Sequence, residues 1–376
     1  MQQAKSFQID VAQSVLDDLK VRLAQTRWTD EPENAGWSYG TNPIYLRELV
    51  TYWLESFDWR AQETLLNSFP QYKAKIDGID IHFIHVKGKG AHTRPLILTH
   101  EWPDSFYRFY KLIPMLTEAT QPGGITFDLV IPSMPGQGFS QRITMTSAEI
   151  AGLWGKLMTE VLGYKSFYAG GDFAVTTKLS SLYSNRLKGL LLTDVGYPNG
   201  TENWAEYTTP EQAFGQQIQR WFFEEGAFNM IQSTKPQTLG YALNDSPVGL
   251  ASWILEKFYS WSDTKSNIEN SFSKDELLTN IMIYWVTATI NTSIRRYAAD
   301  TRAMFALGYP APFKRVEAPT AVAVFPADSD IPMEWAARRT NLQYFNNMAR
   351  GGRFAALEVP ELYAEFIRHA TIALDK

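Results

Sequence analysis

An aspartate occupies a tight strand-to-helix turn in the segment Phe167-Tyr168-Ala169-Gly170-Gly171-Asp172-Phe173-Ala174-Val175. Two glycines precede the acid, as a nucleophile elbow requires. Such a turn holds the side chain above the edge of a sheet, and the backbone N–H of Phe173 can then stabilise an oxyanion. In the alternative interpretation Asp172 only caps the following helix, which aspartate does often.

Short apolar runs of the kind buried in a parallel sheet lie on both sides of this segment. They alternate with segments of helical periodicity, at Phe106 to Leu116 and Ser147 to Leu162. This order is typical of βαβ units and predicts an α/β fold with a mostly parallel central sheet. The expected strands are Pro95–His100, Phe127–Ser133, Ser166–Gly170, Leu187–Thr193 and Thr320–Pro326.

The remainder of the chain is predicted to be mainly helical. Residues 10–66 have helical periodicity, and the next segment, Lys73 to Ile84, alternates around the turn signal Asp77-Gly78, which predicts a hairpin. A helical insertion of about 130 residues separates the last two expected strands, and we interpret it as a lid over the sheet. The predicted division is a helical leader with a hairpin (1–90), a first core part (91–198), the lid (199–305) and a last core part (306–376).

Composition excludes several classes of protein. The 376 residues are 14% aromatic and 20% charged, which is globular, and the net charge of −5 argues against a nucleic-acid partner. With no cysteine, disulfides and thiolate chemistry are excluded. We expect a cytoplasmic protein with no membrane partner, because neither a signal peptide nor a span of ~20 apolar residues occurs. No metal-ligand spacing or phosphate-binding loop occurs, so no metal and no cofactor are expected, and a homodimer is compatible with the sequence.

A second loop with candidate site residues is His100-Glu101-Trp102-Pro103, directly after an expected strand. In an α/β-hydrolase the second oxyanion donor comes from such a loop, which predicts that the backbone N–H of Trp102 joins that of Phe173. We favour a structural role for His100, bracing the loop, and expect a cis bond before Pro103.

Strings along nearly the whole chain resemble the microsomal type of epoxide hydrolase, a family with the α/β-hydrolase fold. The resemblance predicts that fold, with an N-terminal helical domain and a helical lid. Its strings are Phe57-Asp58-Trp59-Arg60, Asn67-Ser68-Phe69-Pro70-Gln71, Asp77-Gly78-Ile79-Asp80-Ile81-His82-Phe83, Pro132-Ser133-Met134-Pro135-Gly136-Gln137-Gly138-Phe139-Ser140, Ser233-Thr234-Lys235-Pro236-Gln237-Thr238 and Asn244-Asp245-Ser246-Pro247-Val248-Gly249-Leu250.

The resemblance implies a two-step reaction on a small apolar or aromatic epoxide. An elbow aspartate, here Asp172, attacks the epoxide and forms an alkyl ester, while two lid tyrosines protonate the epoxide oxygen. A histidine–acid pair then activates the water that cleaves the ester. The acid of such enzymes lies in a Phe-Pro-x-Asp setting, which matches Asp328, with Asp330 as the second choice.

The chain departs from the family pattern at the expected site. The base histidine corresponds to Arg353, which stays protonated and cannot act as a base. One tyrosine corresponds to Phe228, which has no hydroxyl, whereas the other is retained as Tyr297. Two glycines of the oxyanion loop are replaced by Glu101 and Asp104, and Trp-Gly after the nucleophile has become Phe173-Ala174. These changes converge on one pocket, which indicates that selection or design acted there.

Two functions follow from this pattern. The first is a hydrolase-type enzyme that keeps Asp172 but is impaired in ordinary epoxide hydrolysis, its pocket diverged or engineered for another reaction. Arg353 then holds carboxylates ionised or binds an anionic group, and Glu101 either replaces the base or only pairs with Arg353. The alternative is an inactive, ligand-binding homologue. In both cases a buried Arg353 requires carboxylate partners, and we predict Asp328, Asp172 or Glu101.

Overall fold

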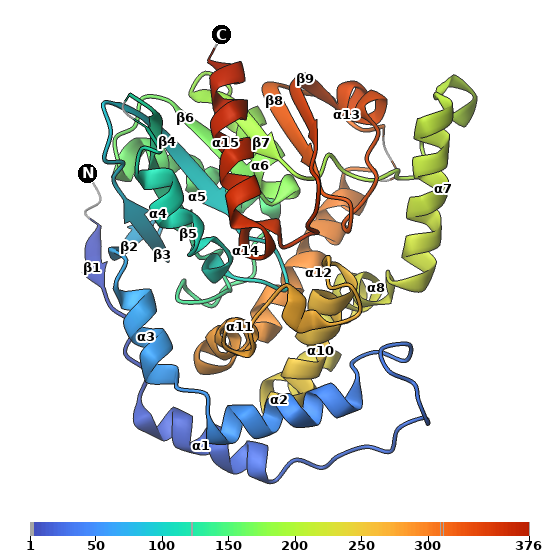
Figure 1. Ribbon diagram of the computed structural model, residues 1–376. Coiled ribbons are helices and arrows are strands. Elements are labelled where there is room, and N and C mark those ends of the chain that lie inside the picture. The colour runs from blue at the N-terminus through green and yellow to red at the C-terminus, as the bar shows by residue number, and fades with distance from the viewer. Residues whose placement is uncertain (1–3, 122, 309, 311, 376) are drawn as a thin grey trace.

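The computed structural model describes residues 4–121, 123–308, 310 and 312–375, and the chain forms one nine-stranded sheet in the order β1-β2-β3-β5-β4-β6-β7-β8-β9 (Figure 1). Pairing is antiparallel from β1 to β5 and parallel from β5 through β4 to β9, which confirms the predicted mostly parallel sheet. The strands are β1 (Lys5–Phe7), β2 (Gln71–Ile76), β3 (Ile79–Val86), β4 (His92–Thr99), β5 (Ile125–Pro132), β6 (Phe167–Gly171), β7 (Leu187–Leu192), β8 (Val316–Val324) and β9 (Thr340–Asn347).

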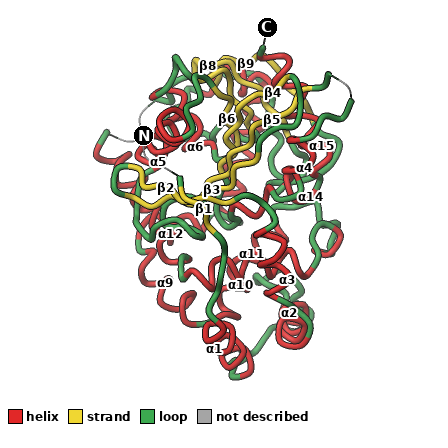
Figure 2. Tube along the Cα trace, turned by 90° about the vertical axis from the view of Figure 1, so that its left-hand side faces the viewer, coloured by secondary structure: helices red, strands yellow, loops and turns green. Residues whose placement is uncertain are grey.

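Helices cover both faces of the sheet (Figure 2). On one face lie α4 (Leu112–Thr117) and α15 (Pro360–Leu374), and on the other lie α5 (Ser147–Lys156) and α6 (Phe173–Leu182). Successive side chains of a strand point to opposite faces of the sheet, and both faces are apolar here because helices cover both. In β4, Leu96 and Leu98 pack into one apolar cluster and Ile97 into the other.

The N-terminal part contains the predicted hairpin and three helices, α1 (Gln13–Ala24), α2 (Pro43–Glu55) and α3 (Trp59–Asn67). β2 and β3 pair antiparallel, and Asp77 and Gly78 both have positive φ, as a two-residue hairpin turn demands. In Figure 1, α1 and α2 lie lowest, against helices of the insertion, where α2 contacts α10 and α11.

Between β7 and β8 the described residues form helices and no strand, and we call α7 to α12 the insertion helices. Thr208 and Ser273 start α7 and α11 with capping boxes, in which each side chain accepts from the backbone N–H three residues on. In Figure 1 α7 rises at the right of the molecule and the others lie below the sheet. Their bounds are α7 (Thr209–Glu224), α8 (Ala227–Thr234), α9 (Pro236–Asp245), α10 (Pro247–Ser260), α11 (Lys274–Thr287) and α12 (Ile290–Ala306), with short helices η3 (Trp204–Glu206) and η4 (Ile268–Asn270).

Several elements differ from the prediction. The helix expected over Phe106 to Leu116 is broken into η1 (Phe106–Phe109) and α4, since Pro114 has no N–H to continue the earlier turn. The helix after Ser147 ends in a π-helical turn, η2 (Leu157–Val161). β1, β9, α13 (Met333–Arg339) and α14 (Ala355–Glu358) were not predicted, and the edge strand β9 lacks a continuous apolar run because it is only half buried. The four-part division of the chain stays a prediction. No described helix has the length and apolar character needed to cross a bilayer.

Candidate active site

Five ionisable residues follow the carboxyl ends of five parallel strands. Glu101 comes after β4, Asp172 after β6, Asp194 after β7, Asp328 after β8 and Arg353 after β9. The carboxyl ends of parallel strands lie at one edge of a sheet, which is where open α/β sheets place their ligand sites. The strand order therefore gathers residues from five separate loops of the chain.

Asp172 is both the residue of the turn and the cap of the helix. It is 5% exposed, and its Oδ1 accepts a hydrogen bond of 2.9 Å from the backbone N–H of Val175. The positive φ of 97° belongs to Gly171, where a Cβ would lie 1.9 Å from the carbonyl oxygen of Thr99. Asp172 itself has φ −41° and ψ 116°, so the strain of the turn rests on the glycine and not on the acid.

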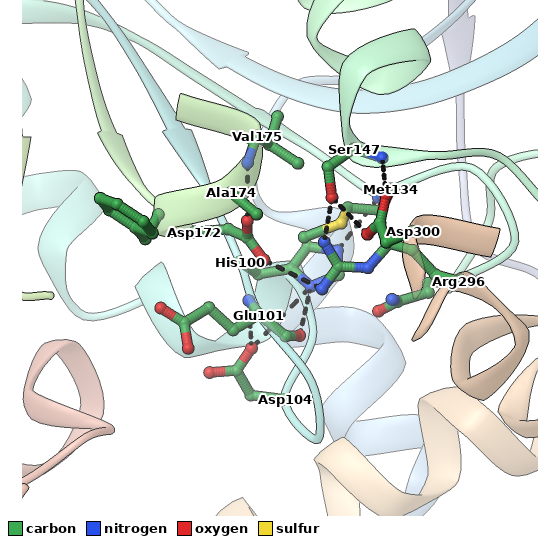
Figure 3. A network of polar contacts seen from close by, with 12 residues as sticks. His100, Glu101, Asp104, Met134, Ser147, Asp172, Ala174, Val175, Arg296 and Asp300 are labelled. Carbon is green, nitrogen blue, oxygen red and sulfur yellow. Dashed lines mark hydrogen bonds and ion pairs between the residues drawn. The ribbon is translucent and has the colours of Figure 1, made fainter. Parts of the chain in front are cut away.

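The second oxygen of Asp172 is held by an arginine of the insertion helices, as Figure 3 shows. Nη2 of Arg296 in α12 lies 3.0 Å from Oδ2 of Asp172, and Nη1 donates to the Ser147 hydroxyl at 3.2 Å. Burial alone would lower the pKa of Arg296, but Asp172 and Asp300 outweigh it and raise that pKa, so the guanidinium stays charged. Sequence analysis missed this residue, although its place directly before Tyr297 in a helix with one buried face is a usable signal.

Arg353 lies among three other carboxyl groups. Its Nη2 is 2.7 Å from Glu101 and 3.8 Å from Asp194, and its Nη1 is 3.4 Å from Asp328. The prediction that Arg353 pairs with at least one of Asp328, Asp172 and Glu101 is confirmed by Glu101 and Asp328, whereas Asp172 pairs with Arg296. Asp330, the second choice for the acid, is exposed.

The balance of charge around Arg353 is visible in the pKa values of its partners. Burial raises the pKa of Asp328 to about 6 and also raises that of Asp194, although Arg353 opposes both shifts. Burial would lower the pKa of Arg353, but Glu101 and the other nearby acids raise it. One permanently charged guanidinium therefore serves three carboxyl groups.

The loop after β4 is braced by His100, in agreement with the structural role favoured for it. Its Nε2 accepts from the backbone N–H of Met134 at 3.0 Å, so Nδ1 carries the proton and donates to the carbonyl of Glu101 at 3.0 Å. Burial lowers the pKa of His100 to about 4, and the ring is neutral. The Trp102–Pro103 bond is cis, as expected.

Asp104 belongs to the support of the same loop. It accepts from the backbone N–H of Glu101 at 2.9 Å and lies 2.6 Å from Nη1 of Arg108, whose Nη2 donates to the carbonyl of Arg353 at 2.7 Å. Burial raises the pKa of Asp104 to about 7. Asp104, through Arg108, thus links the loop after β4 to the loop after β9.

A cavity of about 410 Å³ lies between the insertion helices and the loops after β8 and β9. Phe228 stacks on Trp102 with 5.4 Å between ring centres and meets Tyr297 edge-on at 6.2 Å. Asp172 is not among the lining residues, and the expectation that it and Arg353 face one cavity stays a prediction. The lining consists of Trp102, Tyr197, Gln217, Trp221, Phe222, Glu225, Phe228, Asn229, Ser260, Trp261, Tyr297, Pro326, Ala327, Asp328 and Arg353.

Three further residues were missed by sequence analysis. Asp194 follows the strand Leu187–Leu192 just as Asp172 follows β6, and this parallel was available in the sequence. Tyr197 accepts from Nη1 of Arg353 at 3.3 Å. Lys257 of α10 is buried, 3.1 Å from Glu225 and 2.5 Å from Glu256, and only the tertiary structure brings its Nζ over the rings of Phe228 and Trp261. Trp102 and Phe173 follow adjacent strands, and the predicted convergence of their N–H groups stays a prediction.

Comparison with known proteins places this site in a family. The family model "Epoxide hydrolase N terminus" matches residues 4–109. A putative epoxide hydrolase of Stigmatella aurantiaca is 40% identical over 374 residues, covering 96% of this chain and 83% of the relative. The chain belongs to the epoxide hydrolase family. Epoxide hydrolase 1 of Oryctolagus cuniculus is 37% identical, covering 96% of this chain and 87% of that one. Among solved epoxide hydrolases, the juvenile hormone epoxide hydrolase of Bombyx mori superposes with a TM-score of 0.86 at 29% identity, covering 100% of this chain and 95% of that one.

Proposed function

We propose that this epoxide hydrolase carries out the first half of the reaction, alkylation of Asp172, and is slow in the second half, hydrolysis of the ester. The proposal rests on one observation: the guanidinium of Arg353 lies 2.7 Å from Glu101 and 3.4 Å from Asp328, where the family resemblance places a base. A guanidinium that is charged and paired on two sides cannot accept a proton from water.

In the first step, a carboxylate oxygen of Asp172 forms a bond to an epoxide carbon, and the bond from that carbon to the epoxide oxygen breaks. The oxygen takes up the proton of the Tyr297 hydroxyl, and the tyrosine is later reprotonated from solvent. Burial raises the pKa of Tyr297 well above its ordinary value, so the hydroxyl holds its proton until the alkoxide forms. The product is a hydroxyalkyl ester on the protein.

The second step requires a base to deprotonate water. Glu101 is the nearest candidate from the sequence, but its carboxylate is already paired with Arg353 at 2.7 Å. His100 is neutral, but both of its ring nitrogens are already hydrogen-bonded within the loop. The ester is therefore expected to persist.

The test is the intact mass of the protein after incubation with styrene oxide. We expect a gain of one epoxide mass that accumulates to one equivalent, with little diol formed. Asp172→Asn is the control and must not gain mass. Arg353→His should shorten the lifetime of the adduct, but overall diol formation should recover only in part, because Phe228 supplies no second hydroxyl to the alkylation step.

A ligand-binding homologue without turnover is the second candidate, and one observation favours it. Both oxygens of Asp172 are engaged, by Val175 and Arg296, and the residue lies outside the cavity lining. For this function, incubation with the epoxide leaves the mass unchanged while the compound still quenches the fluorescence of the cavity tryptophans.

A further inference from the structure

The cavity is surrounded by more carboxyl groups than cations. Arg353 is shared by Glu101, Asp194 and Asp328, and Lys257 by Glu225 and Glu256. Arg296 is engaged by Asp172, and Arg339 donates to the backbone carbonyls of Val195 and Tyr197. Arg353, which lines the cavity, and Lys257, whose Nζ lies over the lining rings of Phe228 and Trp261, therefore each face more than one acid.

This imbalance bears on what Arg353 can bind. A guanidinium without carboxylate partners would attract an anionic group, and binding of such a group was one expectation from the sequence. Here three carboxyl groups lie within 3.8 Å of it. An added anion would meet their repulsion before it gained the attraction of Arg353, whereas a cation would relieve that repulsion.

The walls of the cavity are aromatic. Trp221 lies 5.9 Å from Tyr197 and 6.2 Å from Trp261, measured between ring centres, and Tyr297 lies 6.1 Å from Trp102. The faces of indole and phenol rings attract organic cations, and several such rings around one space form the usual cage for an ammonium group.

We propose that the cavity selects an organic cation, a protonated or quaternary amine, with its ammonium beside Asp328 and the aromatic walls. Of the three carboxyl groups around Arg353, Asp328 lines the cavity and Glu101 and Asp194 do not. Whether such a cation also reacts as a substrate rests on the proposed function, but the prediction that it binds does not.

The test compares three probes of similar shape by quenching of tryptophan fluorescence: benzyltrimethylammonium, its neutral carbon isostere neopentylbenzene, and phenylacetate. We expect the cation to bind at least tenfold more tightly than the isostere, and the anion to bind most weakly. Equal binding of cation and isostere, or tighter binding of the anion, overturns the proposal.

The matched variants are Asp328→Asn and Asp330→Asn, since Asp330 is an exposed carboxylate two residues away. Asp328→Asn should weaken the cation about tenfold and leave the isostere unchanged, whereas Asp330→Asn should change neither. If Asp328→Asn does not fold, the ratio of cation to isostere in the unaltered protein decides alone. Binding that favours the cation while styrene oxide adds no mass would leave this inference standing and refute only the proposed alkylation.

Discussion

The ion pair between Arg296 and Asp172 should restrain the proposed nucleophile. With 3.0 Å between Nη2 and Oδ2, the attraction is about 5 kcal/mol at an effective dielectric constant of about 20. When the carboxylate becomes an ester it loses its charge, and a transition state with half the charge gone forfeits about 2 to 3 kcal/mol. Because each 1.36 kcal/mol is tenfold in rate, Arg296→Met should alkylate about 30- to 160-fold faster than the unaltered protein.

The assay is a time course of intact mass with styrene oxide at pH 8.5. Arg296→Lys keeps the charge and should stay near the original rate, and Arg295→Met replaces the neighbouring arginine, which is not a partner of Asp172. Arg296→Met should also lower the free energy of unfolding by about 3 to 5 kcal/mol, since it leaves a buried carboxylate without its cation. A folded Arg296→Met that alkylates at the original rate would refute the restraint, and absence of alkylation in all variants would refute Asp172 as nucleophile.

Three further predictions concern stability, each measured by urea unfolding. Arg353→Met should lower the free energy of unfolding by about 3 to 5 kcal/mol because it strands the carboxylates of Glu101 and Asp328, whereas Met in place of the exposed Arg350 should cost little; similar losses in both would contradict the pairing. Burial lowers the pKa of His82 to about 3, so the unfolded chain binds a proton that the folded chain refuses as pH falls below about 6.5. Between pH 7 and pH 5 this one group should lower the free energy of unfolding by about 2 kcal/mol. Over the same interval the free energy of unfolding of His82→Asn should fall by about 2 kcal/mol less than that of the unaltered protein. An equal fall in both would show that His82 is not buried in its neutral form. Ser273→Ala removes the cap of α11 and should cost about 1 kcal/mol, a value that an unchanged midpoint would contradict.

Local structure was predictable because it depends on neighbours in the chain. The strand-turn-helix around Asp172, the hairpin at Asp77-Gly78 and the helical insertion before β8 all followed from periodicity and turn residues. The βαβ order also determined that Glu101, Asp172 and Asp328 lie at one edge of the sheet, since parallel strands end together. Even the need of Arg353 for carboxylate partners follows from the cost of burying an unpaired cation.

Only the tertiary structure decided which acidic and basic side chains form ion pairs. Arg296 of α12 reaches Asp172 across 124 positions of the chain, and no periodicity of the sequence indicates how one helix is rotated toward a distant turn. Arg296 therefore pairs with Asp172, whereas Arg353 lies beside Glu101, Asp194 and Asp328. Sequence patterns determine which faces are buried, whereas ion pairing depends on distances of about 3 Å between side chains that only the packed elements bring together.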